Sequence, residues 1–245
     1  MTTGPGRPRL TSPRRPGSSA SEQILDAAAE LFTTVGFTAT STRKIADAVG
    51  IRQASLYHHF GTKEEILEVL LERTVSPALA AAESLTAAEL PVAVALHALS
   101  WYDASQLASS RWNLGALYLL PELSSPSLAP FVAQRQTLRG YYSDLAVRAL
   151  HEEVSGADTD TPDPILVDLP FRIVESAIAT RADDGNDIDA EPAEYGLTLA
   201  DAGLRALGID PTPVAEPSRR AVEALDDATS LAPFRPSGSG DTGTQ

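Results

Sequence analysis

The sequence contains no cysteine among its 245 residues, and its aromatic content is only 6%. The lack of cysteine excludes disulfide bonds and thiolate metal sites. No apolar run approaches the length of a membrane-spanning helix, and the N-terminus lacks the apolar segment of a signal peptide. We therefore expect a soluble, cytoplasmic protein with no membrane contact, whose core draws on a hydrophobic content of 43%.

Signatures of catalysis and of metal binding are also missing. The chain has no Gly-rich phosphate loop, no G-x-S-x-G elbow and no H-E-x-x-H motif. His97 and His151 are isolated, and the acidic run at 183–189 lacks the residue order of a calcium loop, so a solvated loop is the better interpretation. We expect no enzyme, no metal site and no cofactor.

The negative charge is distributed unevenly along the chain. The net charge is −14, yet residues 1–60 carry seven basic and four acidic residues and are therefore positive. The remaining residues carry a net charge of −17. Because phosphate binding needs a local basic surface and not a basic whole protein, this division favours nucleic-acid contact by the N-terminal end.

Residues 22–66 have the pattern of three short helices separated by sharp turns. Apolar residues from Ile24 to Val35 recur at helical spacing, and Ser19 with Glu22 forms a capping box ahead of them. Ser41 can cap a second helix over 42–48, and Gly50 provides the bend before a third helix over 53–60. This arrangement is typical of a helix-turn-helix that enters a major groove.

The run TSTRKIADAVGIRQASLYHHFGTKEEI resembles the DNA-binding domain of the tetracycline-repressor (TetR) family. The matching positions are Thr40, Arg43, Ile45, Ala46, Ala48, Gly50, Leu56, Tyr57, His59, Phe60, Lys63 and Glu64. Arg52 stands where the family often has Ser, and Ala54 where it often has Gly. The first departure is expected to remove a side-chain cap from the third helix.

The resemblance implies which residues of this segment contact DNA. Gln53, Ser55 and Arg52 would read base edges, Ala54 would meet a thymine methyl or allow close approach, and Tyr57, His58 and Lys63 would hold phosphates. The full predicted set is Thr42, Arg43, Lys44, Arg52, Gln53, Ala54, Ser55, Tyr57, His58 and Lys63. We expect His59 and Phe60 to pack internally.

The remaining chain is predicted to be helical and to form an all-α, two-domain protein. Helices are expected from Thr62 to about Ser76 and near 78–88, 91–109, 111–120, 127–155, 164–182 and 191–207. The predicted divisions are a disordered basic arm at 1–18, a helix-turn-helix domain at 19–66, a helical ligand-binding and dimerisation domain at 67–210, and a mostly disordered tail at 211–245. The arm either stays a solvated tail or follows the minor groove or backbone of DNA.

Aromatic residues gather in the second half of the chain, among a few polar ones. They are either ordinary core residues or the lining of a cavity for a small-molecule inducer, which the family resemblance favours. The candidate lining residues are His97, Trp101, Tyr102, Trp112, Tyr118, Phe131, Arg139, Tyr142 and Phe171.

The helices near 164–182 and 191–207 each carry an apolar face, and Gly196 and Gly203 permit another helix to come close. These faces either pack within one subunit or, as the resemblance implies, form a homodimer interface that includes Leu204. We therefore expect a homodimeric regulator that binds double-stranded operator DNA and is released by a small molecule. A ligand-independent DNA-binding protein is the alternative, and a helical enzyme or carrier with an incidental helix-turn-helix is the more distant one.

Overall fold

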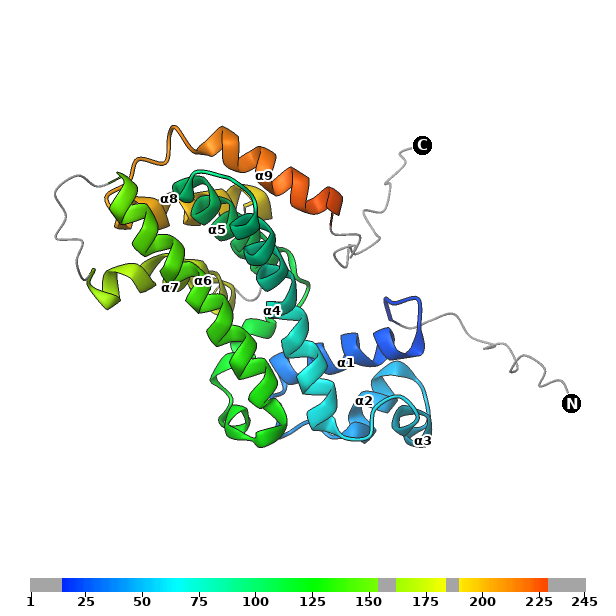
Figure 1. The fold of residues 1–245 in the computed structure, drawn as a ribbon. Helices are drawn as coiled ribbons and strands as arrows, with labels where there is room; N and C mark the ends of the chain where they lie inside the picture. The colour runs from blue at the N-terminus through cyan, green and yellow to red at the C-terminus, as the bar shows by residue number, and fades with distance from the viewer. Residues whose placement is uncertain (1–14, 154–161, 184–189, 229–245) are drawn as a thin grey trace, which may run out of the picture. The chain divides into compact units, whose positions relative to one another are not determined.

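The computed structural model describes residues 15–153, 162–183 and 190–228, and all of its regular elements are helical. The all-α fold class predicted from the sequence is thereby confirmed. The chain divides into two compact units, Met1–Leu67 and Glu68–Gln245. Figure 1 shows the path of the helices. Within the described ranges, no helix is both long and apolar enough to cross a membrane.

The first unit contains α1 (Ala20–Thr34), α2 (Thr42–Val49), α3 (Gln53–Tyr57) and the first residues of α4 (Lys63–Ala87). The predicted capping box at the start of α1 is present, because the Ser19 side chain accepts from the Glu22 backbone N–H and the Glu22 side chain accepts in return. This arrangement satisfies backbone donors that a helix N-terminus leaves without partners.

The turn between α2 and α3 depends on Gly50, which has a φ of 77°. Its N–H donates to the Ala46 carbonyl and so ends α2 in the left-handed conformation that glycine adopts without steric penalty. Arg52 precedes α3 without a side-chain cap, as the sequence predicts. The helix is shorter than predicted and ends at Tyr57 instead of Phe60.

The second unit consists of helices grouped around α5. Its elements are α5 (Val92–Ser109), η1 (Leu114–Leu119), η2 (Pro121–Ser124), η3 (Pro126–Leu128), α6 (Ala129–Glu153), α7 (Pro164–Asp183), α8 (Pro192–Ala206) and α9 (Ala215–Ala228). Helix α5 contacts α6, α7, α8 and α9, and it is buried on all sides along its first turns (Figure 1). Such all-round burial identifies α5 as the central helix of this unit.

The structure corrects three predicted element boundaries. The helices predicted to end at Ser76 and to begin at 78 are one helix, α4, which continues through Pro77 because its apolar residues on both sides of the proline are buried. The helix predicted at 111–120 is instead a single 3-10 helix, η1, over Leu114–Leu119. Two more 3-10 turns follow it and begin at Pro121 and Pro126, where proline fixes φ and lacks the N–H that would extend a preceding helix.

The third correction concerns the predicted disordered tail at 211–245. Residues 215–228 form α9, while residues 229–245 lie outside the described ones. The helix packs on α5 through buried Leu225 and through Ser218, whose hydroxyl donates to the Val94 carbonyl at 3.3 Å. The Pro- and Ser-rich composition concealed this contact, because only a few apolar residues make it.

The two glycines expected at a dimer interface serve contacts within one chain. A Cβ at Gly196 would come within 2.8 Å of the Trp101 carbonyl oxygen on α5, and one at Gly203 would touch Pro170 on α7. Leu204 is only 1% exposed in the isolated chain, so its predicted position between subunits is wrong. It packs inside the subunit because α8 turns that face toward α5 and α7.

Candidate DNA-binding surface and ligand cavity

The exposed end of the first unit is formed by α3 and the start of α2. Gln53, Tyr57 and Thr42 form one hydrogen-bonded group there: the Gln53 amide donates to the Thr42 hydroxyl at 2.9 Å, and the Tyr57 hydroxyl lies 3.1 Å from that same oxygen. Tyr57 is 49% exposed and Gln53 is also exposed. The group therefore presents polar atoms in a fixed arrangement, which base or phosphate contacts require.

The other predicted DNA-contacting residues surround this group. Arg43, Lys44, Arg52, Ala54 and His58 are exposed, and Ser55 is half-buried on α3. His59 is exposed as well, so its predicted internal packing is wrong, whereas Phe60 is buried as predicted.

Two of the predicted phosphate-binding lysines also bind carbonyl groups of the first unit. The Lys63 ammonium donates to the Phe37 carbonyl at 2.8 Å and lies 4.0 Å from the centre of the Phe37 ring. The Lys44 ammonium donates to the Ala39 carbonyl at 2.8 Å. An ammonium has three donors, so each lysine keeps donors for a further acceptor while its position is held by the protein.

Arg15 ties the helices of the first unit together, a role that sequence reasoning missed. Its guanidinium pairs with Asp26 at 3.0 Å and with Glu30 on α1, and its Nε donates to the Ala48 carbonyl of α2 at 3.2 Å. Residues 1–14 of the predicted basic arm lie outside the described residues. The signal for this contact was Asp26 itself, an acidic residue on the otherwise apolar face of α1.

The second unit contains a small cavity whose wall combines apolar and charged side chains. Its lining comes from four α-helices and η1: Thr74 and Val75 on α4, Asp103 and Leu107 on α5, Tyr118 on η1, Arg135 and Leu138 on α6, and Phe171 and Glu175 on α7. The space open to the centre of a water molecule is about 10 Å³, which is enough for one water.

Asp103 is a buried carboxyl group in the wall of this cavity. It is 4% exposed, and it accepts a hydrogen bond from the Tyr142 hydroxyl at 3.0 Å. Burial raises its pKa to about 7; the Tyr142 hydrogen bond opposes this increase, and the nearby Glu175 carboxylate adds to it. Asp103 is therefore divided between its protonated and ionised forms near neutral pH.

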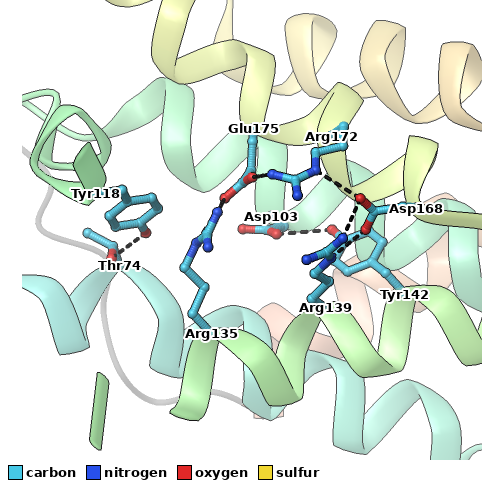
Figure 2. Close-up of polar contacts among 9 residues, drawn as sticks. All are labelled: Thr74, Asp103, Tyr118, Arg135, Arg139, Tyr142, Asp168, Arg172 and Glu175. Carbon is cyan, nitrogen blue, oxygen red and sulfur yellow. Dashed lines mark hydrogen bonds and ion pairs between the residues drawn. The ribbon is translucent and has the colours of Figure 1, made fainter. Parts of the chain in front are cut away.

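Arg135 is the cationic residue of the cavity wall. Its guanidinium lies 5.2 Å from the centre of the Tyr118 ring and 5.4 Å from that of Phe171, and its Nε donates to Glu175 at 3.0 Å (Figure 2). The Tyr118 hydroxyl donates to Thr74 at 2.6 Å, and burial raises the pKa of Tyr118 above its usual value.

A series of ion pairs continues from the cavity along α6 and α7. Glu175 also contacts Arg172, Arg172 donates to Asp168 at 2.9 Å, and Asp168 accepts from Arg139 (Figure 2). Burial alone would raise the pKa of Asp168, but the hydrogen bonds from Arg139 and Arg172 and their charges lower it on balance. Arginine and carboxylate therefore alternate along the series, whose two end residues, Arg135 and Arg139, lie on α6.

The structure places five of the nine predicted lining residues in or beside the cavity. Tyr118 and Phe171 line it, Phe131 contacts the Tyr118 ring at 5.4 Å between centres, Tyr142 bonds Asp103, and Arg139 lies on the ion-pair series. The other lining residues were not in the predicted set: Thr74, Val75, Asp103, Leu107, Arg135, Leu138 and Glu175.

The other four predicted lining residues lie elsewhere. His97 is fully buried and its Nε2 lies 3.0 Å from Asp201 on α8; burial lowers its pKa. The Trp101 indole donates to the Ala193 carbonyl of α8 at 2.8 Å. His97 and Trp101 therefore both contribute to the packing of α5 against α8. Trp112 stacks under Arg111, and Tyr102 is half-buried outside the lining.

Comparison with known proteins supplies two kinds of similarity. The family described as bacterial regulatory proteins, tetR family, matches residues 24–70. The repressor KstR2 of Rhodococcus jostii is 51% identical over 49 residues, which are 20% of this chain and 24% of that protein. The chain thus matches only about a quarter of the length of this curated relative.

Similarity to solved structures extends over most of the chain. AmtR of Mycobacterium smegmatis is 48% identical, with a TM-score of 0.77 over 88% of this chain and 98% of that chain. The ketosteroid transcriptional regulator KstR2 of Mycobacterium tuberculosis is 22% identical, with a TM-score of 0.63 over 79% of this chain and 95% of that one, and it shows a common fold.

Proposed function

Since the chain belongs to the TetR family of bacterial regulatory proteins, we propose that it is a homodimeric transcriptional repressor that a small molecule releases from its operator. It would act in the cytoplasm, where the chromosome lies. The observation that carries the proposal is the exposed, hydrogen-bonded group of Gln53, Tyr57 and Thr42 at the end of a helix-turn-helix.

DNA reading is assigned to α3. Gln53 presents an amide, which can bind the edge of an adenine through two hydrogen bonds, and Ala54 and Ser55 follow it on the same short helix. Arg43, Lys44, Tyr57, His58 and Lys63 would hold phosphates around it.

Dimerisation is assigned to the outer surfaces of α7 and α8. Ile165 at the start of α7 is 73% exposed, and Leu169 and Ile173 follow it at helical spacing with partial exposure. A second copy of the chain that covers these side chains would place two DNA-binding units in one dimer. Two linked DNA-binding units bind two half-sites of an operator more tightly than a single unit binds a single half-site.

Ligand binding is assigned to the cavity around Asp103 and Arg135. Its wall includes Thr74, which lies on α4 and accepts from Tyr118. Helix α4 begins at Lys63, so a ligand that rearranges this wall acts on the same helix that follows the DNA-binding segment. Release requires that the ligand bind the two arrangements of the protein with unequal affinity.

The test is DNA binding by fluorescence anisotropy, with duplexes selected from a random library. We expect the selected duplexes to share a palindromic sequence and their binding to weaken steeply as the salt concentration rises. Gln53→Ala should lose discrimination at one base pair of each half-site and keep the same salt dependence. A protein that selects no common sequence would contradict the repressor function.

A ligand-independent regulator is the second candidate, and the size of the cavity favours it. A cavity that holds one water leaves no room for an organic molecule unless the wall rearranges. A metabolite screen in which no compound changes operator affinity would favour this candidate over the ligand-released repressor.

A further inference from the structure

The cavity wall resembles a binding site for an organic cation, and a side chain of the protein occupies it. The Arg135 guanidinium lies within 5.4 Å of the centres of the Tyr118 and Phe171 rings. It also pairs with Glu175 (Figure 2). Aromatic faces and a carboxylate are the groups that attract guanidinium and ammonium ions in proteins.

The two carboxyl groups of the cavity wall differ in their partners. Glu175 pairs with two arginines, Arg135 and Arg172. Asp103 has the Tyr142 hydroxyl as a partner and, among the described residues, no cation within ion-pair distance. An ionised Asp103 therefore lacks a counter-ion, which a bound cation would provide.

The wall also contains a side chain that can make room. The space at present suits one water, so any larger ligand must displace a wall residue. The Arg135 side chain is 29% exposed and can therefore turn toward solvent, while Asp103, Leu138 and Phe171 are almost fully buried.

We propose that this cavity binds a small organic cation, a guanidinium, amidinium or primary ammonium compound, which displaces the Arg135 guanidinium from its place beside Tyr118 and Phe171 and pairs with Asp103 and Glu175. The inference rests on the proposed ligand-released repressor and names the chemical class of its ligand. An anion would instead face two carboxylates, and a neutral molecule would leave Asp103 without a counter-ion.

The protonation of Asp103 gives this site a pH dependence. Its pKa of about 7 reflects burial first, with Glu175 from α7 raising it and the Tyr142 hydroxyl from α6 lowering it. Arg135 of α6 and Tyr118 of η1 are the other ionisable groups of the wall. A cation binds the ionised carboxylate, so its affinity falls up to tenfold for each pH step below about 7. Binding releases a proton where the free protein holds Asp103 protonated, near and below pH 7, and no proton well above it.

The experiment is calorimetric titration of the full chain with three planar probes of similar size. Methylguanidinium is the cation, methylurea the neutral control and acetate the anion. We expect methylguanidinium alone to bind, and Arg135→Ala to bind it at least tenfold more tightly because the competing side chain is gone.

Two carboxyl variants complete the design. Asp103→Asn should weaken methylguanidinium binding at least tenfold and abolish its pH dependence. Asp144→Asn removes the same charge from the exposed surface of α6, where the carboxylate pairs with Arg148 at 3.5 Å, and should change nothing. Melting curves of each variant confirm that it folds.

The outcomes separate the ligand class from the proposed function. Three results would overturn the inference: methylurea that binds as well as methylguanidinium, acetate binding that Arg135→Ala abolishes, and methylguanidinium that binds neither wild type nor Arg135→Ala. None of these results would affect the proposed binding to operator DNA. Cation-selective binding that leaves operator affinity unchanged would support the site and contradict ligand release.

Discussion

Replacement of Asp103 by asparagine tests whether a carboxyl group is buried without a cation in the second unit. Asparagine has nearly the same shape, and its carbonyl oxygen can still accept the hydrogen bond from Tyr142. The substitution therefore removes the ionisable group while it keeps the packing. Any difference in stability that varies with pH then reports the titration of Asp103 itself.

The sign and size of the effect follow from the two pKa values. The pKa of Asp103 is about 7 in the folded protein and 3.8 when the group is exposed. Between these values the folded chain holds a proton that the unfolded chain has lost, so the wild type loses stability as the pH rises from about 4 to about 7. The full loss is about 4 kcal/mol, at about 1.4 kcal/mol for each pH step.

The assay is urea unfolding of wild type and Asp103→Asn at pH 5, 6, 7 and 8, at one fixed protein concentration because the proposed dimer would add to stability. We expect the variant to gain on the wild type with rising pH and the difference to level off above pH 7. Asp144→Asn, whose carboxyl group is exposed, should show no such trend. A difference between Asp103→Asn and wild type that stays constant over this range would refute the burial argument.

Three further predictions concern DNA binding, the first unit and assembly. Gln53→Ala should relax preference at one base pair of each half-site, at about 1–3 kcal/mol per lost contact, in competition assays with single-base variants. Arg15→Ala removes a cation from a carboxylate, Asp26, whose side chain is 5% exposed, so we expect a lower melting temperature and weaker binding to every duplex alike. Ile165→Glu should yield folded monomers in sedimentation because the residue is 73% exposed, whereas Leu204→Glu should unfold the chain because that residue is 1% exposed.

The first unit could be predicted closely because its signals are local. The Ser19 capping box and the glycine turn at residue 50 each act within a few residues, and both are found as predicted. The Arg15 contacts could not be predicted in the same way, since they join residues up to 33 positions apart. Sequence spacing carries no information on such pairs.

The second unit shows where local signals fail. Helix α9 was missed because its burial depends on α5, more than 120 residues earlier, as the Ser218–Val94 hydrogen bond shows. A helix was predicted to end at about Ser76, yet α4 continues through Pro77 because the apolar residues on either side are buried. In both places tertiary packing outweighs the local preference.

The cavity illustrates the same limit for a functional site. Its aromatic walls, Tyr118 and Phe171, could be anticipated from the clustering of aromatic residues, but Asp103 could not, because its burial depends on helices that the sequence does not place. One signal was present: Asp103 lies on a helix whose other residues are mainly apolar, and an acidic group there must either be paired or raise its pKa. Burial and partner together decide which: the described residues give Asp103 a hydroxyl partner and no cation, so its pKa rises.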